Sequence, residues 1–371
     1  MHLFFYLFFL ELVIAVTAYT NVAEYVFMPV RMRTERYLSK ERLETYLILS
    51  LGIVFVFHAF KNPLTLEDIP EYVDAFAEAK HISFERIVNI GYESTKSETG
   101  FAIVIKVISE LFSHSQVLFV ITSAVIVSAL YFSIERYSPI YWISVFVFIV
   151  DTFAQSLFIL RAFLALSIYL FAFPAIINRK LLTYCLLALL AFSVHTTSVI
   201  FFPVYFLYGI KDWRYLILTT LILTIVLIVG FDFFLMFLIE NVFQSYMYYI
   251  VNADNYEGAS WKMPALLSAI LLFRIGVMRR HFFEEGCNRL LSLVLILAVV
   301  IYVAGMGFGL TSRMAMYFTN MTFLILPNTL KYLRSSSLQF LVAVVYILFN
   351  GFFFFRNASD ILWVNYSLID I

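Results

Sequence analysis

Charged residues are scarce in this chain. Asp, Glu, Lys and Arg make up only 13% of its 371 residues, whereas 63% of the residues are hydrophobic. A water-soluble domain of this length cannot bury so much apolar surface, because much of its surface has to stay in contact with water. The composition therefore excludes an ordinary soluble enzyme and predicts an integral membrane protein.

Features that accompany nucleic-acid or cofactor binding are also missing. The 25 Lys and Arg residues are balanced by 25 Asp and Glu residues, so no basic surplus indicates a nucleic-acid partner. The two cysteines, Cys185 and Cys287, follow no metal-binding or redox spacing and are interpreted as apolar filling residues. The chain has no P-loop, no GxGxxG segment after a strand, no HExxH and no Asp-x-Asp pair. We therefore expect no metal, no cofactor and no use of ATP.

Long apolar segments are what the chain has instead. A membrane-spanning helix takes about 20 mainly apolar residues. The predicted spans are 3–28, 44–60, 116–134, 139–154, 156–177, 181–195, 196–210, 215–239, 264–280, 289–309, 313–330 and 338–355. The first segment lacks a basic start and contains Glu11, which favours a retained helix over a cleaved signal peptide. The prediction is an all-α bundle of about 12 spans, forming a single membrane domain over residues 1–371.

The apolar segment 100–113 is shorter and contains Lys106 and Glu110, which are spaced to form an ion pair within one helix. If this segment is re-entrant or interfacial, most loop Lys and Arg residues fall on one side, which is then the cytoplasmic side. If it crossed the membrane, this bias would disappear. We therefore predict that 100–113 does not cross, and that both termini and two polar loops face outward. The first loop, 61–99, is predicted to carry short interfacial helices, and the second is 241–262.

Ionisable residues within apolar segments are the candidates for chemistry, because each costs about 2.5–3.5 kcal/mol on insertion scales. Four of them are predicted to arrive near the outer surface from distant parts of the chain: Glu98, Arg161, His195 and Arg313. Arginine pairs bind pyrophosphate oxygens through double hydrogen bonds, and a histidine suits proton removal from a sugar hydroxyl. The pattern predicts a site for a lipid pyrophosphate, which carries its own leaving group.

Each candidate also has a purely structural interpretation. Arg161 could pair with Asp151 or Glu98, His195 could bind a backbone carbonyl, and Arg313 could reach toward the outer interface. Other residues are interpreted more simply. Arg274, with Arg279 and Arg280, is predicted to be a positive-inside anchor. The outer-loop tyrosines form either an interfacial aromatic belt or a sugar-stacking surface; they are Tyr246, Tyr248, Tyr249 and Tyr256.

Five short motifs occur in an order that resembles a known family. They are Asp68-x3-Tyr72, Glu98-Thr99-Gly100-Phe101, Arg161-x3-Ala165, His195 after an apolar run, and Arg313-x3-Tyr317-Phe318. This order is similar to that of the repeat-unit polymerases of O-antigen, capsule and exopolysaccharide synthesis, the Wzy class, and especially of their EpsG-like branch. Thr99 in place of a proline, and Ala162 where glutamine is frequent, depart from the family pattern.

The resemblance implies a membrane-embedded glycosyltransferase fold of the GT-C type in the bacterial inner membrane. It implies that a growing glycan moves from undecaprenyl pyrophosphate onto an incoming lipid-linked repeat, without metal, by an inverting displacement and with a chain-length-regulating co-polymerase. The catalytic candidates are then His195, Glu98 and Asp68, and the substrate-binding candidates are Arg161, Arg313, Tyr72, Tyr317, Tyr249 and Tyr256. The alternatives are a glycan ligase, an acyltransferase, or a flippase for lipid-linked oligosaccharide.

Overall fold

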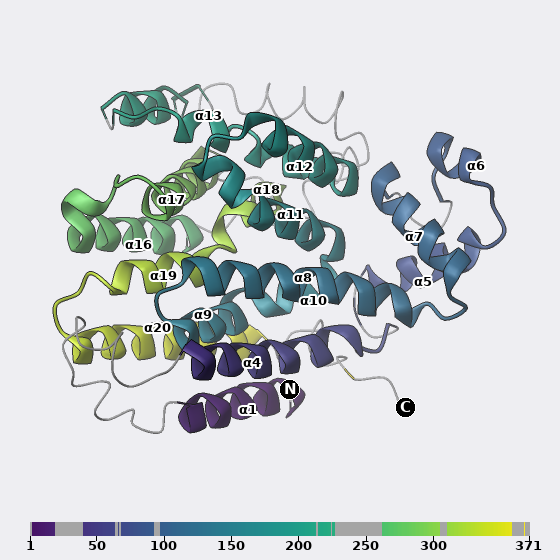
Figure 1. Cartoon of the computed structure of the whole chain (residues 1–371), viewed down its shortest axis with the longest axis horizontal. Helices are drawn as coiled ribbons and strands as arrows, with labels where there is room; N and C mark the ends of the chain where they lie inside the picture. The colour runs from purple at the N-terminus through teal and green to yellow at the C-terminus, as the bar shows by residue number, and fades with distance from the viewer. Residues whose placement is uncertain are drawn as a thin grey trace. The chain divides into compact units, whose positions relative to one another are not determined.

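The computed structural model is helical throughout the part of the chain that it describes (Figure 1). The described residues are 2–18, 40–63, 66, 68–92, 97–212, 214–223, 225–226, 262–304, 310–357 and 367. These residues form helices, turns and connecting segments, and none of them lies in a β-strand. The all-α prediction is confirmed at this level.

Six helical segments are long and apolar enough to cross a membrane. They are Arg42–Ala59, Gln116–Tyr137, Tyr141–Phe158, Leu160–Ile177, Cys287–Ala304 and Ser336–Phe353. Each coincides with a predicted span, and four shorter apolar helices coincide with others: Tyr6–Ala18, Leu181–Val194, Thr196–Tyr208 and Arg214–Leu223. Large apolar side chains on several of them are exposed, including Leu182 and Leu348, as expected of surfaces that face lipid. The protein is integral to a membrane.

The chain divides into two compact units. Unit 1 comprises Met1–Phe171 and Thr322–Ile371, and unit 2 comprises Ala172–Met321. The helices of unit 1 are α1 (His2–Ala18), α4 (Lys40–Ala59), α5 (Ile69–Ala79), α6 (Phe84–Asn89), α7 (Thr99–Leu111), α8 (Gln116–Tyr137), α9 (Tyr141–Phe148), η1 (Ile149–Phe153), α10 (Ala154–Phe158), α19 (Thr322–Leu330) and α20 (Ser336–Asn357). Within unit 1, α4 packs on α1 and α8, and α9 packs on α19.

Unit 2 has its own set of packed helices. They are α12 (Leu181–Val194), η2 (Thr196–Phe201), α13 (Val204–Tyr208), α16 (Lys262–Met278), η5 (Arg279–His281), α17 (Cys287–Ala304) and α18 (Leu310–Thr319). Helix α17 packs on α13, α16 and α18, and η2 packs on α12 and α18. The boundary between the units falls within α11 (Leu160–Ile177).

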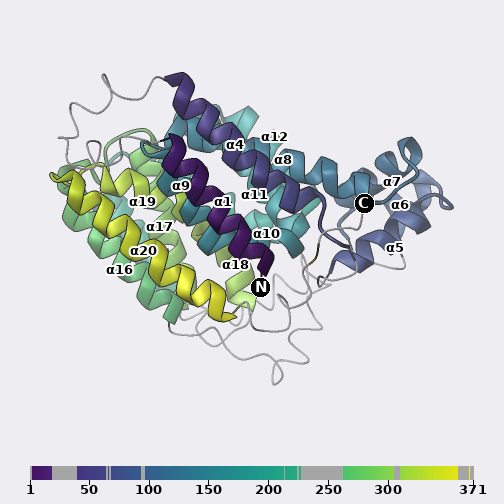
Figure 2. The ribbon, with the colours of Figure 1, turned by 90° about the horizontal axis from the view of Figure 1, so that it is seen from below.

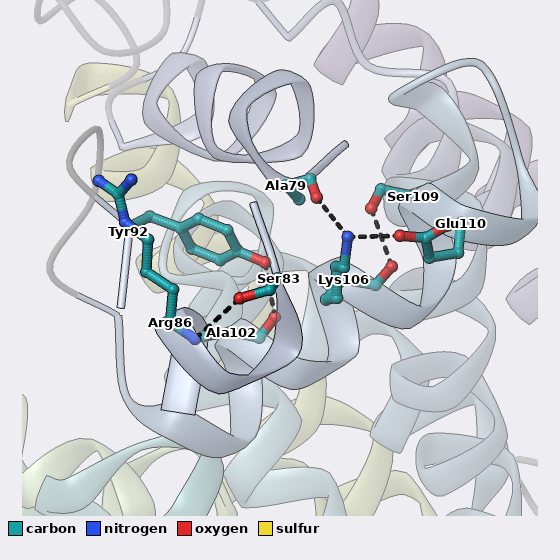
Figure 3. Close-up of polar contacts among 8 residues, drawn as sticks. All are labelled: Ala79, Ser83, Arg86, Tyr92, Ala102, Lys106, Ser109 and Glu110. Atoms are coloured by element: carbon teal, nitrogen blue, oxygen red, sulfur yellow. Dashed lines mark hydrogen bonds and ion pairs between the residues drawn. The ribbon is translucent and has the colours of Figure 1, made fainter. Parts of the chain in front are cut away.

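Helices α5, α6 and α7 form a small group at one end of α4 and α8 (Figures 1 and 2). Lys106 on α7 donates to the carbonyl of Ala79, the last residue of α5, at 2.7 Å and pairs with Glu110 (Figure 3). Tyr92 donates to the carbonyl of Ala102 at 2.8 Å. The Lys106 contact with Ala79 fixes α7 against α5, the helix that carries Tyr72, and the Tyr92 contact fixes α7 against the segment that follows α6.

Most of the segment 100–113 forms helix α7, and its position in the membrane stays a prediction. Helix α7 has 13 residues and is therefore only about 20 Å long, which is shorter than a hydrocarbon core of about 30 Å. It packs on the short helices α5 and α6. The predicted pair Lys106–Glu110 is present on it.

The prediction for Arg274 was wrong. Its side chain is fully buried instead of extending to an aqueous surface. Its Nε donates to Ser292 Oγ at 3.0 Å and its Nη2 to the Asn288 carbonyl at 3.1 Å. The sequence suggested an anchor because Arg279 and Arg280 follow, and only these two are exposed.

Candidate functional site

Arg161 is the centre of a polar cluster in unit 1. Its Nη1 lies 2.6 Å from Glu98 Oε2, and its Nε donates to the hydroxyl of Tyr72 at 3.1 Å. Glu98 comes from the start of α7 and Tyr72 from α5. The structure therefore brings three of the predicted residues together, although they are separated by up to 89 positions in the sequence.

Arg161 and Glu98 remain accessible to a ligand. Their side chains are 21% and 13% exposed, whereas Tyr72 is 2% exposed. Burial raises the pKa of Tyr72 more than the Arg161 charge lowers it, so the hydroxyl stays protonated. The ring of Tyr72 packs edge-on against Phe101 at a centroid distance of 5.3 Å. A neutral tyrosine thus orients the guanidinium, while Glu98 forms an ion pair with it.

The position of Arg161 in its helix also favours an anion. It is the second residue of α11, where the partial positive charge of the helix N-terminus opposes another cation. An anion at that end would interact with the guanidinium and with the positive end of the helix dipole. The cluster is therefore arranged to hold a negatively charged group beside Glu98, and an arginine fork suits phosphate.

Two buried residues fix the chain just before Arg161: His58, which lies in α4, and Lys61, which follows that helix. His58 Nε2 contacts the carbonyl of Ser156 at 2.7 Å, and Lys61 Nζ donates to the carbonyl of Leu157 at 2.6 Å. Both carbonyls belong to the last turn of α10. The helix ends there because Ile159, with ψ 56°, leaves the helical conformation. His58 and Lys61 thus satisfy the groups freed at the break from which α11 starts.

This support was not predicted from the sequence. Lys61 lies at the start of the predicted outer loop 61–99, but it is fully buried, and His58 was not singled out. The available signal was His58, an ionisable residue inside the predicted span 44–60, which is costly there unless it has a fixed partner. Burial lowers the pKa of Lys61 from 10.5 to about 7.

The pKa of Lys61 predicts a pH dependence of stability. Between about pH 7 and pH 10.5 the unfolded chain binds a proton at this lysine that the folded chain does not, so stability should rise with pH across this window. Lys61→Met should remove this rise, measured as the apparent unfolding temperature in detergent. Lys80→Met, at an exposed lysine of unit 1, is the matched control. An unchanged pH dependence in Lys61→Met would contradict the assignment.

Unit 2 brings together a second set of predicted residues. His195 caps the end of α12 with an extended backbone and is 6% exposed. Two residues later, the hydroxyl of Thr197 lies 3.2 Å from the hydroxyl of Tyr317, which is fully buried on α18. Arg313 is one turn before Tyr317 on the same face of α18 and is exposed. The turn carrying His195 and the helix carrying Arg313 therefore pack directly on each other.

The remaining predicted residues have different outcomes. Asp68 is exposed at the N-terminus of α5, in a left-handed conformation with φ 59°. Asp151 pairs with no cation among the described residues, Arg161 included; its Oδ2 accepts from Tyr346 at 2.7 Å and from Thr322 at 2.9 Å. Tyr249 and Tyr256, like the loop 241–261, lie outside the described residues. Among the residues described, no three His, Cys, Asp or Glu side chains are grouped as a metal ion requires.

Comparison with known proteins identifies the family. A family model described as the EpsG family matches residues 44–368, which is most of the chain and includes both sets of site residues. Comparisons with curated proteins and with solved structures gave no match. The family is one of exopolysaccharide- and O-antigen-polymerase-like proteins, as the order of the sequence motifs predicted. The chain belongs to the EpsG family.

Proposed function

We propose that this protein polymerises lipid-linked oligosaccharide repeats at the outer face of the bacterial inner membrane. In this proposal the growing glycan leaves undecaprenyl pyrophosphate and joins the terminal sugar of an incoming lipid-linked repeat. The observation that carries the proposal is the accessible Arg161 guanidinium, held by Glu98 and Tyr72 at the start of α11. Membership of a polymerase-like family supports the same conclusion.

The Arg161 cluster is suited to the leaving group. Breaking the bond between the anomeric carbon and the phosphate oxygen leaves the electron pair on the pyrophosphate, whose negative charge increases. A guanidinium already fixed in place stabilises that charge without reorganising, which is where electrostatic catalysis gains most. In the proposal, the phosphate displaces part of the Glu98 interaction with Arg161, while Tyr72 keeps the guanidinium oriented.

The acceptor hydroxyl must lose a proton as it attacks the anomeric carbon. We assign this proton to His195, with Glu98 and Asp68 as the alternative acceptors. Arg313 supplies a second positive charge for the pyrophosphate, and Tyr317 holds the turn of His195 through Thr197. Direct displacement by the acceptor oxygen inverts the anomeric carbon, and neither a metal nor a nucleotide takes part in the step.

The further features of the proposal follow the family resemblance. They are a GT-C-like bundle of about 12 spans, glycan binding by the two outer loops with Tyr249 and Tyr256, and length control by a co-polymerase. The accumulated product in a deletion strain separates the proposal from the ligase alternative. A polymerase mutant leaves single-repeat glycan on the surface, whereas a ligase mutant leaves unattached lipid-linked polymer.

An assay with purified components tests the proposal. The purified protein is incubated with one lipid-linked repeat, in chelator and without nucleotide, and the products are separated by size. We expect a ladder of products that differ by one repeat. Heat-treated protein is the control. Unchanged substrate, with folded protein verified by gel filtration, would contradict the proposed activity.

A further inference from the structure

A second group of buried cations lies in unit 2, where α16 and α17 form a hairpin. Arg289 is 3% exposed and Arg274 is fully buried. Both are held close to the turn that joins the two helices, since Arg274 donates to the carbonyl of Asn288, the residue before Arg289. Such burial of two guanidinium groups is costly unless negative charge or hydrogen-bond acceptors are present.

The hydrogen-bonding capacity of Arg289 is not used up. Its Nε and Nη2 are buried and have no hydrogen-bond partner among the described residues. Its guanidinium lies 5.4 Å from the centre of the Tyr208 ring on α13, which fixes its place without satisfying its donors. The described part of the chain gives Arg289 no ion pair. The nearest carboxylates in sequence, Glu284 and Glu285, are exposed, and Glu284 contacts His281 at 3.0 Å.

The backbone around Arg289 adds to the positive potential. Arg289 lies in the first turn of the 18-residue helix α17, where the helix dipole disfavours a cation and favours an anion. The preceding turn is fixed, because Gly286 adopts φ +93° and its N–H donates to the Tyr208 hydroxyl at 3.0 Å. Two unpaired guanidinium donors and a helix N-terminus therefore meet at one fixed place.

We infer that this place is a binding site for a phosphate group. Two phosphate oxygens would accept from Nε and Nη2 of Arg289 as a double hydrogen bond, and the phosphate charge would offset the buried guanidinium. The phosphate comes either from an anionic phospholipid headgroup or from solution.

Within unit 2, this site lies apart from His195, the residue proposed as the base. Arg289 contacts α13, whereas His195 lies at the far end of α12. Arg179, just before α12, lies over the Tyr205 ring of α13 at 3.9 Å, so the start of α12 is close to α13. The 14 residues of α12 then extend about 21 Å to His195 at the other end of that helix. The inference therefore does not depend on the proposed function.

The experiment compares the stability of the full-length protein in nanodiscs of phosphatidylcholine alone and with added phosphatidylglycerol. We expect the wild-type unfolding temperature to rise with phosphatidylglycerol, and Arg289→Gln to weaken the apparent lipid affinity by about 10- to 100-fold. Arg280→Gln, which removes an exposed arginine of the same turn, should respond as the wild type does. In phosphatidylcholine alone, Arg289→Gln should be at least as stable as the wild type, because it removes an unpaired buried charge.

The outcomes separate the two sources and the rival explanation. A response to inorganic phosphate in phosphatidylcholine discs assigns the site to a free anion, whereas a response to phosphatidylglycerol alone assigns it to a headgroup. No response to either would overturn the inference, as would a response of Arg289→Gln equal to that of the wild type. A loss of stability of Arg289→Gln in both membranes would show a purely structural role. Arg289→Lys, which keeps the charge, provides the comparison if Arg289→Gln is not recovered folded.

Discussion

Replacing Arg161 by alanine should lower the initial rate of ladder formation by about 1,000-fold or more. Removal of one preorganised hydrogen-bond donor from a transition-state charge typically costs about 100- to 1,000-fold, and Arg161→Ala removes a fork of donors together with its charge. Arg161→Lys should recover little of the loss, because an ammonium group cannot form the two parallel bonds of a guanidinium. Arg136→Ala, at an exposed arginine of α8, should leave the rate unchanged.

A paired substitution separates catalysis from structural support. Arg161→Ala alone leaves the largely buried Glu98 without its cation, so a loss of activity could reflect a displaced α7. In the double variant Arg161→Gln with Glu98→Gln, two neutral amides replace the ion pair. We expect this double variant to recover the unfolding temperature but not the rate. Recovery of the rate would mean that the pair only holds α7 in place, and would remove Arg161 from the mechanism.

The long helices were predictable because their signal is local. A run of about 20 apolar residues is sufficient for the spanning helices at 116–137, 287–304 and 336–353, whatever packs around them. The breaks were less predictable. The sequence suggested a turn near residue 155, whereas the chain continues through a π-helical segment and breaks at Ile159. That position depends on His58 and Lys61, whose side chains donate to the freed carbonyls of Ser156 and Leu157.

The candidate site was predictable in its residue types and less so in its contacts. The cost of a charge in hydrocarbon was enough to select Arg161, and Glu98 was one of its two predicted partners. Its other candidate partner, Asp151, instead binds Tyr346 and Thr322. Nothing local distinguishes the two carboxylates, because the choice depends on where α7 packs. Arg289 was not singled out for the same reason: a helix that is apolar on every face gives no sign of which residue turns inward.

Replacing His195 by glutamine should lower the polymerisation rate by about 100- to 10,000-fold, the usual contribution of a general base. Glutamine keeps hydrogen-bonding capacity but cannot take up the proton, so the acid limb of the pH–rate profile should disappear while the apparent KM changes little. The backbone conformation around residue 195 should be unchanged in His195→Gln, because backbone hydrogen bonds hold it. The His195 N–H donates to the Ala191 carbonyl at 2.9 Å, and its own carbonyl accepts from Ser198 at 3.0 Å.

Thr197→Val is the matched control for His195, because it disturbs the same turn without touching the proposed base. It removes the contact with the Tyr317 hydroxyl, so it should reduce the rate but leave the shape of the pH–rate profile unchanged. If His195→Gln retained both the rate and the acid limb, the proton would have to go elsewhere. Asp68→Asn and Glu98→Gln then discriminate between the two carboxylates. Asp68 is the better candidate of the two, because it is exposed at the start of α5 whereas Glu98 is already engaged with Arg161.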